Sequence, residues 1–152
     1  MSQPDSKRAA GAYPAAIVWD LDGTLAESAP DLAVALNAVL EAHGKARHEV
    51  DAVRLMIGGG VPKLIERGFR KSGAPLDEKE LERIVPQFME IYSACATDQT
   101  YLVDHAREAL EHFAKLGVKQ GLCTNKPISV TRKIIAALDI ERYFGSVIGG
   151  DS

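Results

Sequence analysis

Apolar positions along the chain change their spacing twice, and these changes divide it into three parts. Residues 15–19 form a continuous apolar run, which fits a strand of a parallel sheet buried on both faces. From residue 28 to residue 95 apolar side chains recur at helical spacing, with no strand-like run between them. From residue 104 helical and strand-like segments alternate, as in right-handed βαβ units. The pattern predicts a parallel α/β core with a helical insertion after its first strand.

Capping residues, glycines and prolines give the expected element boundaries. The first helix of the insertion begins at Ser28-Ala29-Pro30-Asp31, a capping-box pattern with proline in the first turn. Further helices are expected at about 49–57, 62–73, 77–95, 104–117 and 127–138, with strands at 118–123 and 146–148. We therefore expect a flexible N-terminal tail at 1–14, a core domain formed by 15–30 and 100–152, and a helical cap domain at 31–99.

Composition narrows the class of protein. The chain has 152 residues, is 46% hydrophobic and 26% charged, and carries a net charge of −3, which fits one globular domain and argues against a nucleic-acid binder. No apolar stretch reaches the roughly 18 residues of a membrane span, and Pro14 interrupts the only run that resembles a signal peptide. We expect a cytoplasmic protein with no membrane partner. Cys95 and Cys123 lack metal-ligand spacing, and we expect both to be reduced and buried.

Two polar clusters follow predicted strands: Asp20-Leu21-Asp22-Gly23-Thr24 and Thr124-Asn125-Lys126-Pro127. Ligands of open parallel sheets bind at the carboxyl ends of the strands, where neighbouring strands bring such loops together. Two adjacent carboxylates repel each other unless a cation intervenes, and Mg²⁺ is the natural one because it binds carboxylate and phosphate oxygens. The second cluster supplies a hydroxyl, an amide and a cation at a helix start, which favours phosphate. Taken singly, each cluster is more often turn or cap chemistry; together they indicate phosphoryl transfer.

The segment from Val18 to Leu32 strongly resembles the first motif of the haloacid dehalogenase superfamily. The resemblance implies that Asp20 is the nucleophile of an aspartyl-phosphate intermediate, that Asp22 is the general acid and base, and that both bind Mg²⁺, Asp20 through its carboxylate and Asp22 through its backbone carbonyl. Dehalogenases lack the second aspartate, so Asp22 implies a phosphatase or phosphomutase. The resemblance also implies a Rossmannoid parallel sheet, of which this chain carries the first half, with a mobile helical cap. The implied phosphate-binding residues are Gly23, Thr124, Asn125 and Lys126.

Within the superfamily, phosphoglycolate phosphatases show the strongest likeness. It rests on the segments 28–32, 56–60, 124–127, 138–144 and 148–151. It implies Mg²⁺-dependent conversion of 2-phosphoglycolate, a small phosphorylated metabolite, to glycolate and phosphate, in carbohydrate metabolism. The alternatives are a sugar-phosphate phosphatase or phosphomutase of the same superfamily, and a non-catalytic fragment.

Cap residues and one loop lysine leave alternatives open. Gly58-Gly59-Gly60 is either a backbone-rich loop that closes over substrate or a helix stop with a linker. Arg67 faces either the site or solvent, and Lys126 either meets a substrate carboxylate or is a solvated lysine at a helix start.

The superfamily's third and fourth motifs supply a lysine and acidic metal ligands beyond a Gly-Gly-Asp segment. In this sequence that segment is residues 149–151, and Ser152 follows it directly. We therefore expect this chain alone to be a poor or inactive phosphatase. We also expect it to self-associate through an exposed apolar sheet edge at residues 17–19.

Overall fold

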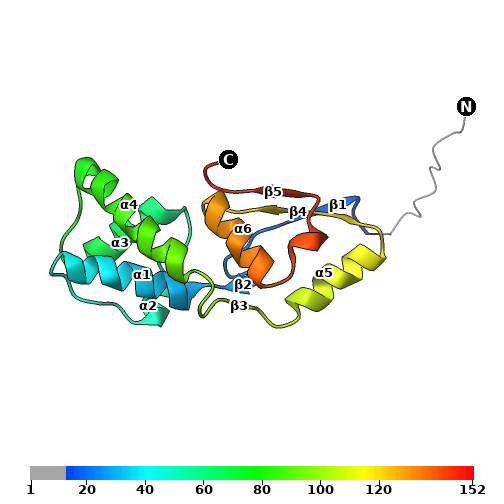
Figure 1. Ribbon diagram of the computed structural model, residues 1–152, viewed down its shortest axis with the longest axis horizontal. Helices are drawn as coiled ribbons and strands as arrows, with labels where there is room; N and C mark the ends of the chain where they lie inside the picture. The colour runs from blue at the N-terminus through cyan, green and yellow to red at the C-terminus, as the bar shows by residue number, and fades with distance from the viewer. Residues whose placement is uncertain (1–12) are drawn as a thin grey trace, which may run out of the picture.

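The computed structural model describes residues 13–152 and places them in two lobes (Figure 1). One lobe contains a parallel sheet of order β1-β4-β5, formed by β1 (Ala16–Trp19), β4 (Lys119–Cys123) and β5 (Ser146–Ile148). The other lobe, the cap, contains α1 (Ala29–Ala42), α2 (Val50–Arg54), α3 (Val61–Lys71) and α4 (Glu78–Cys95). The predicted α/β architecture with a helical insertion after the first strand is confirmed. Most of the predicted tail, residues 1–12, lies outside the described residues.

The sheet is covered by helices on one face. α5 (Ala106–Lys115) and α6 (Ile128–Ala137) lie on the same side of it (Figure 1), where the Trp19 ring packs against Phe113 of α5. Val18 points to the opposite face and is 71% exposed. The prediction that the first strand is buried on both faces is therefore wrong for residues 13–152, because both helices of this lobe pack on one side.

The two cysteines also differ from expectation. Cys123, at the end of β4, is exposed on the uncovered face beside Ile148 of β5, and Cys95 at the end of α4 is half-buried. The prediction that both are buried is therefore wrong, since strand alternation turns Cys123 away from the helices.

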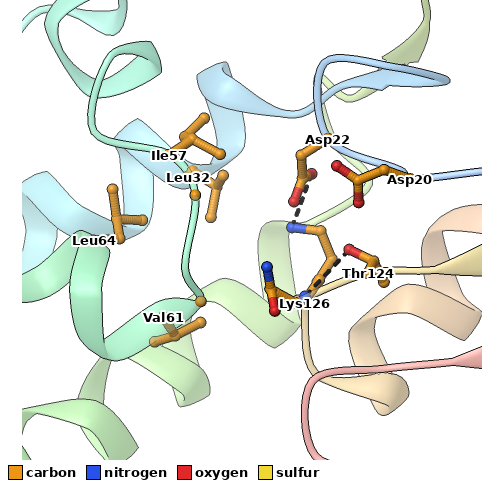
Figure 2. Close-up of a pocket in the computed structure, with 11 residues that line it drawn as sticks. Asp20, Asp22, Leu32, Ile57, Val61, Leu64, Thr124 and Lys126 are labelled. Atoms are coloured by element: carbon orange, nitrogen blue, oxygen red, sulfur yellow. Dashed lines mark hydrogen bonds and ion pairs between the residues drawn. The ribbon is translucent and has the colours of Figure 1, made fainter.

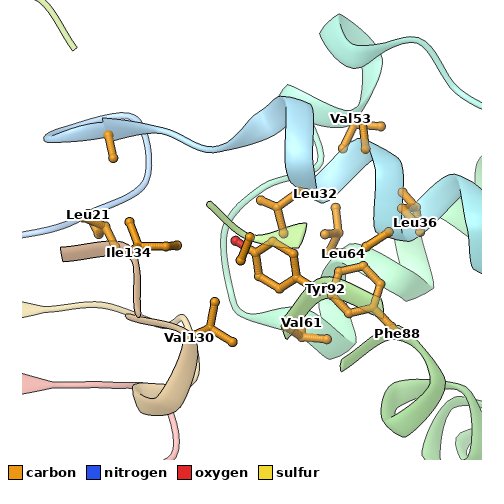
Figure 3. Close-up of a cluster of buried hydrophobic side chains, with 14 of the residues drawn as sticks. Leu21, Leu32, Leu36, Val53, Val61, Leu64, Phe88, Tyr92, Val130 and Ile134 are labelled. Carbon is orange, nitrogen blue, oxygen red and sulfur yellow. The ribbon is translucent and has the colours of Figure 1, made fainter. Parts of the chain in front are cut away.

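The cap helices pack around an apolar core formed by the predicted helical stripes (Figure 3). Phe88 and Tyr92 of α4 are fully buried, with ring centroids 5.5 Å apart. Close packing of α1 on α3 depends on Gly68, because a Cβ there would lie 2.9 Å from Leu36 Cδ1. The apolar faces predicted from the helical spacing thus form the buried surfaces of the cap helices.

A capping box forms at α4, whereas the one expected at α1 does not form. At α4 the box forms: Asp77 Oδ1 accepts from the Glu80 backbone N–H at 2.8 Å, and Glu80 Oε2 accepts from the Asp77 N–H at 2.9 Å. At α1 the prediction is wrong, since Ser28 makes no side-chain cap and its Oγ donates to Asp22 Oδ1 at 2.5 Å. A tertiary partner at the sheet edge replaces the local one.

Three short elements complete the fold, and two of them lie where the chain leaves and re-enters the core. β2 (Ala26–Glu27) and β3 (Tyr101–Leu102) form an antiparallel pair, and a 3₁₀ turn, η1 (Glu141–Tyr143), precedes β5. The sequence did not predict these elements, because two or three residues are too few to show a period. Within residues 13–152, none of the helices combines the length and the apolar character that crossing a membrane requires.

Candidate active site

The loops after β1 and β4 meet at a cavity of about 230 Å³ between the sheet and the cap (Figure 2). The first loop supplies two carboxylates, the second a hydroxyl, an amide and an ammonium group, and the cap an apolar wall with glycine backbone. The lining residues are Asp20, Asp22, Leu32, Ile57, Gly58, Gly60, Val61, Leu64, Thr124, Asn125 and Lys126. The structure thus brings both predicted clusters to one place, although they are far apart in the sequence.

A tight turn sets the positions of the two aspartates. Leu21 between them is fully buried, and its carbonyl accepts backbone hydrogen bonds from Leu25 and Ala26, each at 3.0 Å. Because Leu21 points into the core, Asp20 and Asp22 both line the cavity. Gly23 closes the turn with φ of 75°, a conformation that favours glycine, and does not itself line the cavity.

The two carboxylates have different surroundings. Asp22 Oδ1 accepts a hydrogen bond from Ser28 Oγ at 2.5 Å and lies 3.2 Å from Lys126 Nζ. Asp20, directly after β1, is exposed to solvent at the cavity. Asp22 is therefore held in place by a hydroxyl and a cation, while Asp20 is accessible to a ligand.

Lys126 is buried, with 5% of its surface exposed, so the alternative of a solvated lysine is wrong. Its Nζ donates to Tyr92 Oη at 2.6 Å in addition to its ion pair with Asp22. Burial lowers the pKa of Lys126 from its ordinary value, and the Asp22 carboxylate opposes that shift. Burial, aided by nearby Asp22 and Asp31, raises the pKa of Tyr92, which keeps its hydroxyl neutral. The sequence indicated Tyr92 only as a core position of a helix.

The loop after β4 differs in one respect from the predicted phosphate site. Thr124 Oγ1 accepts from the Lys126 backbone N–H at 3.2 Å and lies in the cavity wall. The first N–H of α6, at Ile128, donates to Asp151 Oδ1 at 2.7 Å, so a carboxylate of this chain already caps that helix. One N–H of the helix start is therefore already taken, and Thr124 and Asn125 are the loop residues that line the cavity.

The glycine segment and Arg67 form one structural unit. Gly58, Gly59 and Gly60 have φ values of 122°, 84° and 89°, and Gly58 and Gly60 line the cavity. Arg67 Nη1 donates to the carbonyl oxygens of Met56 and Gly58, each at 2.7 Å. Arg67 thus acts on the loop: it holds the glycine backbone against the cavity and does not line the cavity itself.

The aspartates after β1 carry the oxygen atoms that the expected metal prefers. Mg²⁺ is usually bound by one or two carboxylates, with waters and substrate phosphate completing its coordination. Asp20 and Asp22 provide such a pair at the cavity. Residues 13–152 contain no cluster of three or more His, Cys, Asp or Glu side chains able to hold a metal. The donor set fits Mg²⁺ bound jointly with substrate, and does not fit an all-protein metal cage.

Fold and site together define a hydrolase class. The sequence profile of haloacid dehalogenase-like hydrolases matches residues 14–152, and the chain belongs to this family. Phosphoglycolate phosphatase of Caulobacter vibrioides is 38% identical over 137 residues, covering 90% of this chain and 58% of that protein. Phosphoglycolate phosphatase of Cereibacter sphaeroides is 37% identical over 136 residues, covering 90% of this chain and 62% of that protein.

Solved structures agree on the fold. A crystal structure from Haemophilus somnus 129pt, described as a predicted phosphoglycolate phosphatase, matches with a TM-score of 0.81 and 30% identity over 91% of this chain. The match covers 63% of that structure's chain. The chain therefore spans less than two thirds of the length of each of these relatives.

Proposed function

We propose that this chain functions as a Mg²⁺-dependent phosphomonoester hydrolase that converts 2-phosphoglycolate to glycolate and phosphate. The observation that carries the proposal is the cavity in which Asp20 and Asp22 meet the Thr124–Lys126 loop. The names of relatives at 37–38% identity support the substrate. A role in carbohydrate metabolism remains a prediction from the resemblance, and a cytoplasmic location remains a prediction from the sequence pattern.

Each residue of the site has a separate role in the proposed reaction. The Asp20 carboxylate attacks phosphorus, forming an aspartyl-phosphate as the ester P–O bond breaks, and Asp22, which enters this step in its protonated form, gives a proton to the departing glycolate oxygen. Asp22 then takes a proton from the water that hydrolyses the aspartyl-phosphate. Thr124 and Asn125 hold phosphoryl oxygens, and Lys126 offsets negative charge. The Asp20 carboxylate and the Asp22 backbone carbonyl would hold Mg²⁺, which would supply further charge compensation.

The dimensions of the cavity favour a small substrate. Its volume, about 230 Å³, is below the roughly 300–1,000 Å³ of pockets for drug-sized ligands. The cap side is an apolar wall of Leu32, Ile57, Val61 and Leu64, which offers no side-chain partner to sugar hydroxyls or to a substrate carboxylate, so the preference rests on size. A two-carbon acid phosphate suits this space better than a hexose phosphate.

Phosphate release from 2-phosphoglycolate and from a hexose phosphate, with Mg²⁺, tests the proposal in the 152-residue chain. We expect faster release from 2-phosphoglycolate, an acid-stable phosphoryl mass on the Asp20 peptide after trapping, and loss of both in Asp20→Asn. Asp104→Asn, at an exposed position that does not line the cavity, should behave as wild type. We expect turnover below the roughly 1–10³ s⁻¹ typical of enzymes, because Lys126 is the one cation lining the described cavity.

Three outcomes contradict the proposal. Unchanged release in Asp20→Asn rules out this nucleophile. Faster hydrolysis of the hexose phosphate favours a sugar-phosphate phosphatase. Absence of both release and trapped phosphoryl group favours a non-catalytic fragment.

A further inference from the structure

Lys126 is the one lysine buried within residues 13–152. An ammonium group removed from water needs partners for its donors, since an unpaired buried charge is strongly unfavourable. Lys126 Nζ lies 2.6 Å from Tyr92 Oη, 3.2 Å from Asp22 Oδ1 and 4.7 Å from the Tyr92 ring centroid. Tyr92 therefore contacts the cation through its hydroxyl, and its ring lies nearby.

These two partners come from different lobes. Asp22 lies on the core loop after β1 (Figure 2), and Tyr92 lies on cap helix α4. Figure 3 shows the hydroxyl end of Tyr92 directed away from the cap interior, toward the side where Leu21 and Ile134 of the core lie. The buried cation therefore bridges core and cap.

Tyr92 has little freedom to move independently of the cap. It is fully buried against Phe88, and the chain that follows α4 is tied to α1, because the Asp31 carboxylate accepts from the Gln99 and Thr100 N–H groups. The position of the Tyr92 hydroxyl is therefore fixed by the cap.

We propose that Tyr92 is a positioning residue: from the cap, its hydroxyl holds the Lys126 ammonium beside Asp22 and the Thr124 loop. The inference rests on the proposed phosphatase function, in which a cation here offsets the charge of the aspartates and of a bound phosphoryl group. A neutral hydroxyl suits this role, because it accepts a hydrogen bond without neutralising the ammonium. The cap thereby contributes, through one side chain, to charge compensation at the core loops.

The experiment compares Tyr92→Phe with Tyr101→Phe, a control that removes an exposed tyrosine hydroxyl, in the 152-residue chain. Each protein is treated with limiting acetic anhydride, and mass spectrometry compares acetylation of Lys126 with that of exposed Lys119. We expect the Lys126-to-Lys119 ratio to rise about tenfold in Tyr92→Phe, because a hydrogen bond to a charged group is lost. The ratio in Tyr101→Phe should equal that of wild type. An unchanged ratio in Tyr92→Phe, or an equal rise at every lysine, overturns the inference.

A double-mutant cycle gives a second measurement that does not depend on labelling. We expect Tyr92→Phe to lower the urea midpoint less in a Lys126→Met background than in wild type, because the shared contact is already absent. An equal decrease in both backgrounds overturns the inference. Neither measurement requires turnover, so an inactive chain contradicts only the phosphatase proposal, and unaltered Lys126 reactivity in an active chain contradicts only the role of Tyr92.

Discussion

Asp20 and Asp22 carry the same side chain two positions apart, and their surroundings separate their roles. Asp22 is held by Ser28 and Lys126, whereas Asp20 is exposed at the cavity. A nucleophile must reach the substrate, while a general acid and base must keep a defined orientation. The proposed division of labour therefore follows from one buried residue, Leu21, and one ion pair.

Thr124 provides a test at the level of one oxygen atom. Thr124→Val removes the Oγ1 that lines the cavity and accepts from the Lys126 N–H. We expect kcat/KM for 2-phosphoglycolate to fall by about 10²–10³, the usual loss when one donor to a developing charge is removed. Steady-state kinetics should show that Thr124→Ser, which keeps a hydroxyl, retains most of the activity. Full activity in Thr124→Val would contradict a role in phosphate binding.

The cysteines should differ in reactivity. Burial is the main cause that raises the pKa of the half-buried Cys95 thiol, and the Asp31 and Asp98 carboxylates raise it further. Cys123 is exposed. Because the thiolate is the reactive form, we expect iodoacetamide to modify Cys123 first and Cys95 slowly, with the Cys95 rate rising at higher pH. Peptide mass spectrometry over time measures both rates. Equal rates in the native protein would contradict the different environments, and Cys123→Ser should abolish the fast phase.

Among the elements, α1 and the segment after α4 meet at Asp31. This carboxylate is fully buried and accepts from Gln99 N at 3.0 Å, Thr100 N at 2.9 Å and Thr100 Oγ1 at 2.8 Å. Hydrogen bonds to a charged acceptor are about twice as strong as neutral ones. Asp31 therefore joins the two chain segments that connect the cap to the core.

Asp31→Ala should destabilise the protein more than the loss of a helix cap. The substitution leaves three donors without their acceptor, and we expect the free energy of unfolding to fall by about 3 kcal/mol. Asp77→Ala, which removes the surface capping box of α4, should lower it by about 1 kcal/mol. Urea unfolding followed by circular dichroism measures both values. A smaller loss for Asp31→Ala than for Asp77→Ala would show that the buried carboxylate is not the stronger tie.

For the whole molecule, the main feature is a sheet with one uncovered face. Within residues 13–152, β1 pairs on one edge only, with β4, and on the uncovered face Val18 is 71% and Ile148 is 49% exposed. An unpaired apolar strand edge is a template for pairing with another chain. The structure thus supports the expectation of an exposed edge, and self-association remains a prediction.

We expect the 152-residue chain to associate reversibly, with a solution mass that rises with concentration. Val18→Lys places a charge on the uncovered face and should shift the protein toward monomer. Leu55→Lys is the matched control, because Leu55 is 88% exposed but lies at the end of α2 in the cap. Analytical ultracentrifugation at several concentrations measures the mass. A wild-type monomer throughout, or equal effects of the two lysines, would contradict association through the sheet.

Much of the architecture could be predicted because its determinants are local. The apolar run before Asp20, the helical stripe of α4 and the polar loop at Thr124 are features of consecutive residues, and period and strand-end chemistry interpret them directly. Parallel pairing of β1 with β4 then brings the two loops together. The sequence by itself therefore determined the α/β class, the cap insertion and the position of the candidate site.

Only tertiary packing determined the hydrogen-bond and ion-pair partners of the polar side chains. Ser28 donates a hydrogen bond to Asp22 instead of capping its own helix, and Asp151 caps α6. Arg67 donates to carbonyl oxygens of the glycine loop, and Lys126 donates to Tyr92 on the cap. Each side chain had a plausible local or solvent partner, and burial determined which contact formed. A buried polar group must be satisfied by whatever lies beside it, and in a folded chain that neighbour is set by packing between elements distant in sequence.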